Sequence, residues 1–183
     1  MRQKTDNEYV LIEYTEHKVD VDTTTSYLSY DLIEKTNLIQ KIFQDSDWLQ
    51  YKELVKNFNS KHTEDESIDR ILSFKRYRGG DRGDVPYDTT SLFEMIFIIK
   101  EIEECHFPQP EIFPWAGGGG LQAEWTFPIY EDYYKEFYIE IGIGPTLDYS
   151  IWICDPYYEL DIEIKDAPIL YRIMKTIFSL LLE

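Results

Sequence analysis

Apolar and polar residues alternate through the second half of the chain. Four segments follow a period of two, which is typical of β-strands with one buried face. They cover residues 121–127, 134–143, 147–153 and 158–164. Glycine and proline lie between the second and third segments, and Asp155-Pro156 lies before the fourth. Such short connections predict an antiparallel meander of four strands.

The first half of the chain has apolar residues three and four positions apart, which is typical of amphipathic helices. This spacing predicts helices within residues 30–43, 48–58, 63–74 and 88–102. The predicted apolar stripe of the fourth helix is Leu92, Met95, Ile96, Ile99 and Ile102. Three prolines follow, at positions 108, 110 and 114, and predict an extended connector.

Local signals mark where several helices begin. Thr63 and Glu66 match a capping box for the third helix. Ser46 or Asp47 is the expected N-cap of the second. Pro168 lies in the first turn of a last helix after Asp166. The apolar positions of this C-terminal helix are Ile169, Leu170, Ile173, Met174, Ile177, Phe178 and Leu181.

The order of these elements predicts an α+β fold, with helices on one face of a four-stranded antiparallel meander and a C-terminal helix. The length of 183 residues predicts a single domain, 1–183. Its helical part covers about residues 1–107, and the meander with the C-terminal helix covers about 108–183. We also expect a short strand around residues 9–12 and loops at 18–26 and 78–86.

The tryptophans test the register of this sheet. Trp125 has the parity of the apolar positions, so we expect it in the core beside Phe127 and Ile139, against the fourth helix. Trp152 has the opposite parity and should face outward. A register one residue out would exchange the two faces of the strand.

The other face of the meander is mostly acidic. It carries Gln122, Glu124, Thr126, Glu136, Tyr138, Glu140, Asp148, Ser150, Trp152, Glu159, Asp161 and Glu163. Residues 128–166 contain ten carboxylates and two lysines, a net charge of −8. Two interpretations remain open. The face is either a solvated or helix-covered surface, or a binding surface with tyrosine and tryptophan among its carboxylates.

The charge of the chain limits the kinds of partner that we expect it to bind. A net charge of −17 repels nucleic acid and anionic membranes and favours a basic partner. The N-terminus leads into no apolar signal segment, and no segment reaches transmembrane length, so we expect a cytoplasmic protein that binds neither membranes nor nucleic acid directly. Cys105 and Cys154 lie far apart, as expected of free thiols.

Candidate chemistry is sparse. No catalytic motif occurs, and His17, His62 and His106 lack metal-ligand spacing. Asp161 and Glu163, with Glu124 or Glu140 nearby, are a candidate for Mg²⁺ binding or proton exchange, but such pairs arise freely among 35 acidic residues. We therefore predict no catalytic residue, no metal and no cofactor.

The basic cluster is Lys75, Arg76, Arg78 and Arg82, which we expect to pair with the protein's own carboxylates.

One segment resembles a known pattern. Leu92 to Ile143 contains an apolar helix, a Pro-rich connector and the strand Gly-Gly-Leu-Gln-Ala-Glu-Trp. This order resembles small uncharacterised bacterial proteins with a Gly-Gly-aliphatic-Gln-x-Glu-Trp strand. The chain departs from them in two extra glycines and a long acidic continuation. The resemblance implies a bacterial or phage protein, with accessory genes of defence or toxin–antitoxin type as its setting.

These patterns support three hypotheses. The first is a non-enzymatic protein that binds a basic protein, such as a toxin or effector, through the acidic sheet face. Its predicted contact residues are Glu124, Tyr138, Glu140, Trp152, Asp161 and Glu163. The second is a DNA mimic that inhibits a nucleic-acid-binding protein. The third is an enzyme of unknown chemistry with a carboxylate-based site, in a pocket beneath Trp115. The C-terminal helix or a sheet edge offers a route to a homo-oligomer.

Overall fold

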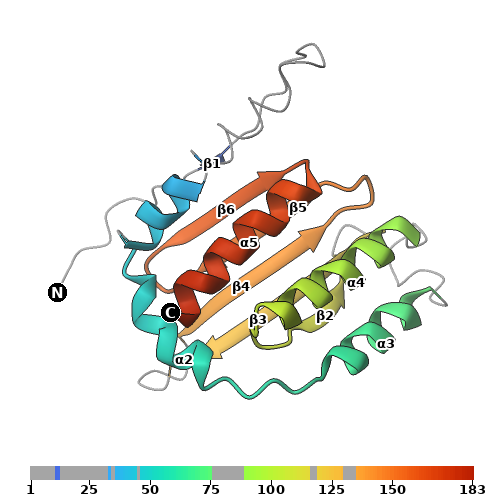
Figure 1. Ribbon diagram of the computed structural model, residues 1–183, viewed down its shortest axis with the longest axis horizontal. Coiled ribbons are helices and arrows are strands. Elements are labelled where there is room, and N and C mark those ends of the chain that lie inside the picture. Colours follow the sequence, from blue (N-terminus) through green and yellow to red (C-terminus); the bar gives the residue numbers. More distant parts are fainter. Residues whose placement is uncertain are drawn as a thin grey trace, which may run out of the picture.

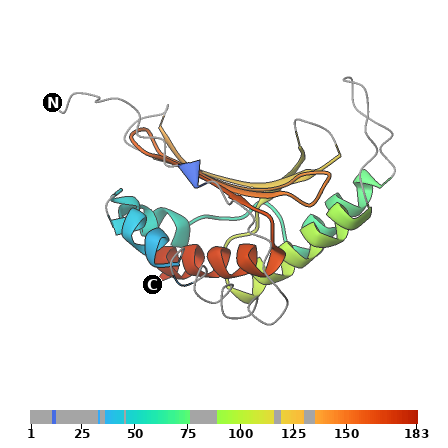
Figure 2. The same ribbon diagram turned by 90° about the horizontal axis from the view of Figure 1, so that it is seen from above.

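One β-sheet with helices on a single side forms the framework of the part of the chain that the structure describes (Figures 1 and 2). The structure is a computed structural model, and it describes residues 11–12, 33, 36–44, 46–75, 89–115, 119–129 and 135–183. Figure 2 shows the strands bowed, with their ends rising away from the helices.

The strands have the order β1-β6-β5-β4-β3-β2 across the sheet. Their bounds are β1 Leu11–Ile12, β2 Glu111–Pro114, β3 Leu121–Pro128, β4 Glu136–Ile143, β5 Tyr149–Cys154 and β6 Glu159–Ile164. Strands β2 to β6 pair antiparallel, and β1 pairs parallel with β6. The α+β class and the antiparallel meander are confirmed, but the expected number of four strands is wrong.

The additional antiparallel strand is β2, which lies in the Pro-rich connector. Its Ile112 pairs with Ala123 of β3, and both side chains are buried. Pro114 ends β2 opposite Leu121. Among the described strands β2 pairs with β3 alone, so it is an edge strand of this sheet, where a proline without an N–H is tolerated.

The helices precede the meander and follow it. Residues 36–44 are helical, and the other elements are the 3₁₀-helix η1 Trp48–Tyr51, α2 Lys52–Lys56, α3 Glu64–Phe74, α4 Thr89–Glu104 and α5 Ala167–Leu182. The capping box of α3 is confirmed, since the Thr63 N–H donates to Glu66 Oε2 at 2.8 Å and the Glu66 N–H to Thr63 Oγ1 at 3.3 Å. Asp47 is the N-cap residue of η1, one of the two expected positions, but it adopts φ 60° and its side chain makes no capping hydrogen bond. Ser46 Oγ donates to the Phe43 carbonyl instead.

Helix α5 packs its whole predicted apolar stripe inside the molecule. All seven predicted positions are buried, and Pro168 lies in the first turn as expected. The stripe therefore belongs to the core of this chain, and a homo-oligomer through α5 stays a prediction. The predicted loops at 18–26 and 78–86, and the basic cluster beyond Lys75, lie outside the described residues.

Trp125 lies in the core, as predicted, with 1% of its surface exposed. It pairs with Ile139 across β3 and β4. Its ring contacts Phe107, just after α4, at 5.6 Å and Phe178 of α5 at 5.8 Å, and its Nε1 donates to the Pro108 carbonyl at 2.6 Å. These two aromatic partners lie outside α4, which itself packs against β3. The buried stripe of α4 also differs from the prediction, because Ile98 is buried whereas Ile96 is only half-buried.

Candidate functional site

The candidate site is the sheet face opposite the helices, which we call the open face (Figure 2). Within the described residues no helix lies over it. The inward side chains of β3 to β6 are all buried, so the register places the other parity on the open face. The acidic surface derived from alternation is therefore a real face of the molecule.

Four of the predicted contact residues form one line across the strands. Glu124 pairs with Glu140, Glu140 with Trp152, and Trp152 with Asp161. We call these four residues the acidic row. Tyr138 precedes Glu140 by two positions and Glu163 follows Asp161 by two, so they flank the row on opposite sides. The structure brings all six predicted residues into one contiguous patch.

Two aromatic rings lie at the centre of this patch. The rings of Tyr138 and Trp152 are 5.1 Å apart with an interplanar angle of 63°, an edge-to-face arrangement. The Tyr138 hydroxyl donates to Glu140 Oε2 at 2.8 Å, and Trp152 Nε1 donates to Glu159 Oε1 at 2.8 Å. Both side chains are half-buried. Carboxylates thus fix the orientation of both rings.

The carboxylates of the row influence one another. Burial raises the pKa of Glu140, and the negative charges of Glu124 and Asp161 raise it further, against the opposing effect of the Tyr138 hydrogen bond. The pKa of Asp161 is raised as well, first by partial loss of hydration and then by the charges of Glu163 and Glu159. Like charges on adjacent strands repel, so this arrangement costs stability.

Neutral donors, rather than cations, hold the two central carboxylates. Gln122 Nε2 donates to Glu124 Oε1, and Tyr138 donates to Glu140. The described ion pairs are Lys56–Glu53, Lys175–Glu101 and Lys61–Glu111. The last of them lies beside the row, because Glu111 of β2 pairs with Glu124. Among the residues that the structure describes, no carboxylate of the acidic row forms an ion pair. The negative charge of the row therefore remains uncompensated in this part of the chain.

Two aromatic residues of the open face escaped the sequence analysis. Phe113 has the outward parity of β2 and pairs with Gln122, and Trp115 follows it by two positions. A Cβ on Gly142 would lie 2.1 Å from Cζ3 of Trp115, so this indole rests on β4. A glycine within a strand, such as Gly142, often marks a place where another group approaches the backbone closely, so Gly142 could have indicated the packing of an aromatic ring here.

The carboxylates considered for metal binding or proton exchange lie on the open face. Glu124 and Glu140 lie opposite each other, but no group of three or more His, Cys, Asp or Glu among the described residues is arranged to hold a metal ion. The indole of Trp115 rests against Gly142.

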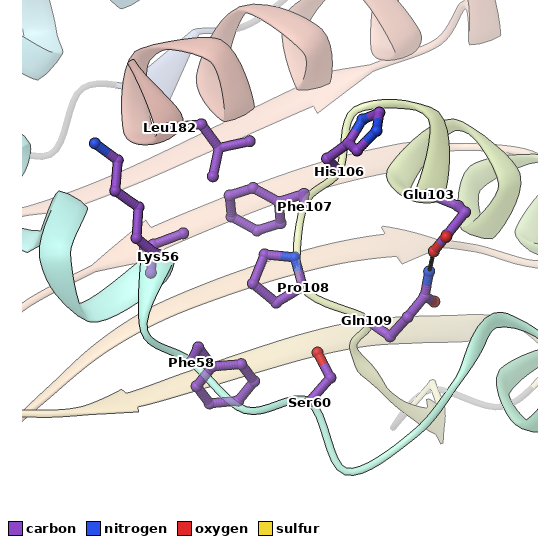
Figure 3. Close-up of a pocket in the computed structure, with 10 residues that line it drawn as sticks. Lys56, Phe58, Ser60, Glu103, His106, Phe107, Pro108, Gln109 and Leu182 are labelled. Atoms are coloured by element: carbon purple, nitrogen blue, oxygen red, sulfur yellow. Dashed lines mark hydrogen bonds between the residues drawn. The ribbon is translucent and has the colours of Figure 1, made fainter.

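A cavity of about 310 Å³ lies instead on the helix side of the sheet (Figure 3). Its lining includes Lys56, Phe58, Ser60, His106, Pro108 and Leu182. The cavity shares no residue with the open face.

Comparison of the chain with models of protein families, with curated proteins and with solved structures gave no match. The resemblance of Leu92 to Ile143 to small bacterial proteins therefore stays a prediction. No helix among the described residues is long and apolar enough to span a bilayer.

Proposed function

We propose that the protein is a non-enzymatic interaction protein that binds a basic protein through the open face. A toxin or another effector is the kind of partner that this chemistry fits, and the protein would act as an immunity protein, antitoxin or inhibitor. One observation carries the proposal: within the described residues, Glu124, Glu140 and Asp161 align around Trp152 on a sheet face that no helix covers, and they form no ion pair.

The carboxylates of the patch attract and orient the partner, and its aromatic rings supply the contact area. A chain with a net charge of −17 accelerates encounters with a cationic partner, and the carboxylates around the row direct that partner to the open face. Trp152 and Tyr138 are half-buried aromatic side chains with fixed orientations. Such residues dominate the binding energy of many protein interfaces, because they bury a large area at little entropic cost.

The destabilisation that these like charges cause also favours a partner that can relieve it. Like charges opposite each other on neighbouring strands destabilise a sheet, and Glu140 is half-buried as well. A cationic group of a partner offsets both effects at once, because it compensates the charge and replaces lost hydration. A merely solvated face gains nothing from holding these carboxylates together.

The DNA-mimic hypothesis fits this geometry less well. A mimic of duplex DNA needs continuous rows of negative charge, because phosphates follow one another along each strand without interruption. Here Trp152 interrupts the row between Glu140 and Asp161. Competition by duplex DNA for a captured partner distinguishes a DNA mimic from the proposed function.

The test is a quantitative capture experiment at low and high salt, with proteins identified by mass spectrometry. The bait is the wild-type protein, a Glu140→Gln/Asp161→Asn variant, or an Asp65→Asn/Asp69→Asn variant. The last two lose the same charge, but Asp65 and Asp69 are exposed on α3, away from the open face.

We expect a basic protein to bind the wild type and the α3 variant at low salt, and to be lost from the open-face variant. High salt should release it, because screening weakens exposed charge pairs. Equal capture by all three baits, or no basic protein at low salt, contradicts the proposal.

A further inference from the structure

Trp152 lies between two carboxylates on neighbouring strands. Glu140 of β4 and Asp161 of β6 are its direct cross-strand partners. Neighbouring strands lie about 4.8 Å apart, so the backbones of Glu140 and Asp161 are roughly 10 Å apart with the indole between them. No described helix covers this arrangement.

The indole is also held in place before any partner arrives. Its Nε1 donates to Glu159 at 2.8 Å, and the ring of Tyr138 packs against it. Tyr138 in turn donates to Oε2 of Glu140 at 2.8 Å. Asp161 is exposed, and no ion pair among the described residues involves it. An aromatic surface with a fixed orientation and negative charge on both sides results.

We infer that this position recognises an arginine side chain, with the guanidinium stacked on Trp152 and its N–H groups donating to Glu140 and Asp161. The inference rests on the proposed function, because the arginine belongs to the basic protein partner. It is narrower than that function, since it names the cation and the place on the sheet where the cation binds.

By charge alone this site would bind a lysine as well as an arginine, but its geometry favours arginine. A guanidinium is planar, stacks on aromatic faces and carries five N–H donors that reach two separate carboxylates at once. A lysine ammonium is a strongly hydrated point charge that gains less from an indole face. The arrangement of one indole between two carboxylates matches the planar cation.

The test uses two short capped peptides, one with alternating arginine and alanine and one with alternating lysine and alanine. Alternation places every cation on one side of an extended peptide. Calorimetric titration at low salt gives the affinity of each peptide for the wild type, Trp152→Leu, Trp152→Phe and Asp69→Asn. Thermal melting of each variant confirms that it is folded.

We expect the arginine peptide to bind the wild type about tenfold more tightly than the lysine peptide, which corresponds to the energy of a partly desolvated cation–π contact. Trp152→Leu should abolish this preference, whereas Trp152→Phe should retain part of it and Asp69→Asn all of it. These results together support arginine recognition.

Equal, salt-sensitive binding of both peptides to the wild type overturns the inference and leaves the proposed function standing. An arginine preference that survives Trp152→Leu also overturns it, because the preference then arises elsewhere. If neither peptide binds at low salt, the inference and the proposed function both fail.

Discussion

Glu140 lies directly opposite Glu124 on the neighbouring strand, and neither carboxylate forms an ion pair within the described residues. The donors that hold them are neutral, the amide of Gln122 and the hydroxyl of Tyr138. A neutral donor orients a carboxylate without removing its charge. The centre of the sheet therefore carries two carboxylates without a paired cation among the described residues, which would attract the cationic partner proposed above.

Glu140→Gln should stabilise the free protein at neutral pH. The amide still accepts from Tyr138 but removes the repulsion from Glu124, so we expect a gain of a few tenths of a kcal/mol to about 1 kcal/mol. Because folding raises the pKa of Glu140, the wild type is stabilised by protonation at low pH and loses this stabilisation as the pH rises through the raised pKa. The gain should therefore shrink in acid.

Urea unfolding of wild type and Glu140→Gln across the acidic and neutral range measures this difference. Asp69→Asn, which removes an exposed charge on α3, is the control. A Glu140→Gln variant that is less stable than the wild type at neutral pH would contradict the repulsion described above.

The two sheet tryptophans should respond differently to truncation. Trp125→Ala removes a buried indole that contacts Phe107 and Phe178, and we expect a loss of about 3–5 kcal/mol or failure to fold. Trp152→Ala removes a half-buried ring and one hydrogen bond, and should cost about 1 kcal/mol. Thermal melting compares them, and similar losses would mean that Trp152 belongs to the core.

Gly120→Ala tests the turn that leads into β3. A Cβ there would lie 2.0 Å from the backbone carbonyl oxygen of Ile143, and backbone cannot move aside as a flexible side chain can. We expect a loss of about 3 kcal/mol or more from this overpacking. Gly144→Ala is the matched control, because its Cβ meets nothing closer than 3.4 Å. Equal melting temperatures for the two variants would refute the close approach at Gly120.

Gly142→Ala should displace the indole of Trp115. The new Cβ would lie 2.1 Å from Trp115 Cζ3 and 2.7 Å from Ser150 Oγ, and both are side-chain atoms that can move. We expect a cost of about 1–3 kcal/mol that falls by at least half in a Trp115→Ala background. This double-mutant cycle by urea unfolding detects the contact. An unchanged cost in the Trp115→Ala background would place the indole elsewhere.

The meander and the last helix were predictable because their apolar periods are unambiguous. In β3 to β6 every second residue is apolar and buried, which identified the open face and the six predicted contact residues on it. The α5 stripe likewise has one continuous helical period. In such segments only one face is apolar, and that face is the buried one.

The other elements were harder to predict because competing signals were present. In α4 the run from Ile96 to Ile99 is apolar on every side, so the period did not distinguish Ile96 from Ile98. In β2 the prolines hid a strand that only an edge position permits. Missing β2 also left Phe113 and Trp115 off the predicted open face. Pairing across strands, which decides such cases, is not a local property of the sequence.

The most direct measurement of the central claim is carboxyl footprinting of the captured complex. Carbodiimide coupling labels accessible carboxylates, and mass spectrometry compares the free and bound protein. We expect partner binding to protect Glu140, Asp161 and Glu163 on the open face and to leave Asp65 and Asp69 of α3 unchanged. Protection of the α3 carboxylates with full labelling of Glu140, Asp161 and Glu163 would contradict binding through the open face.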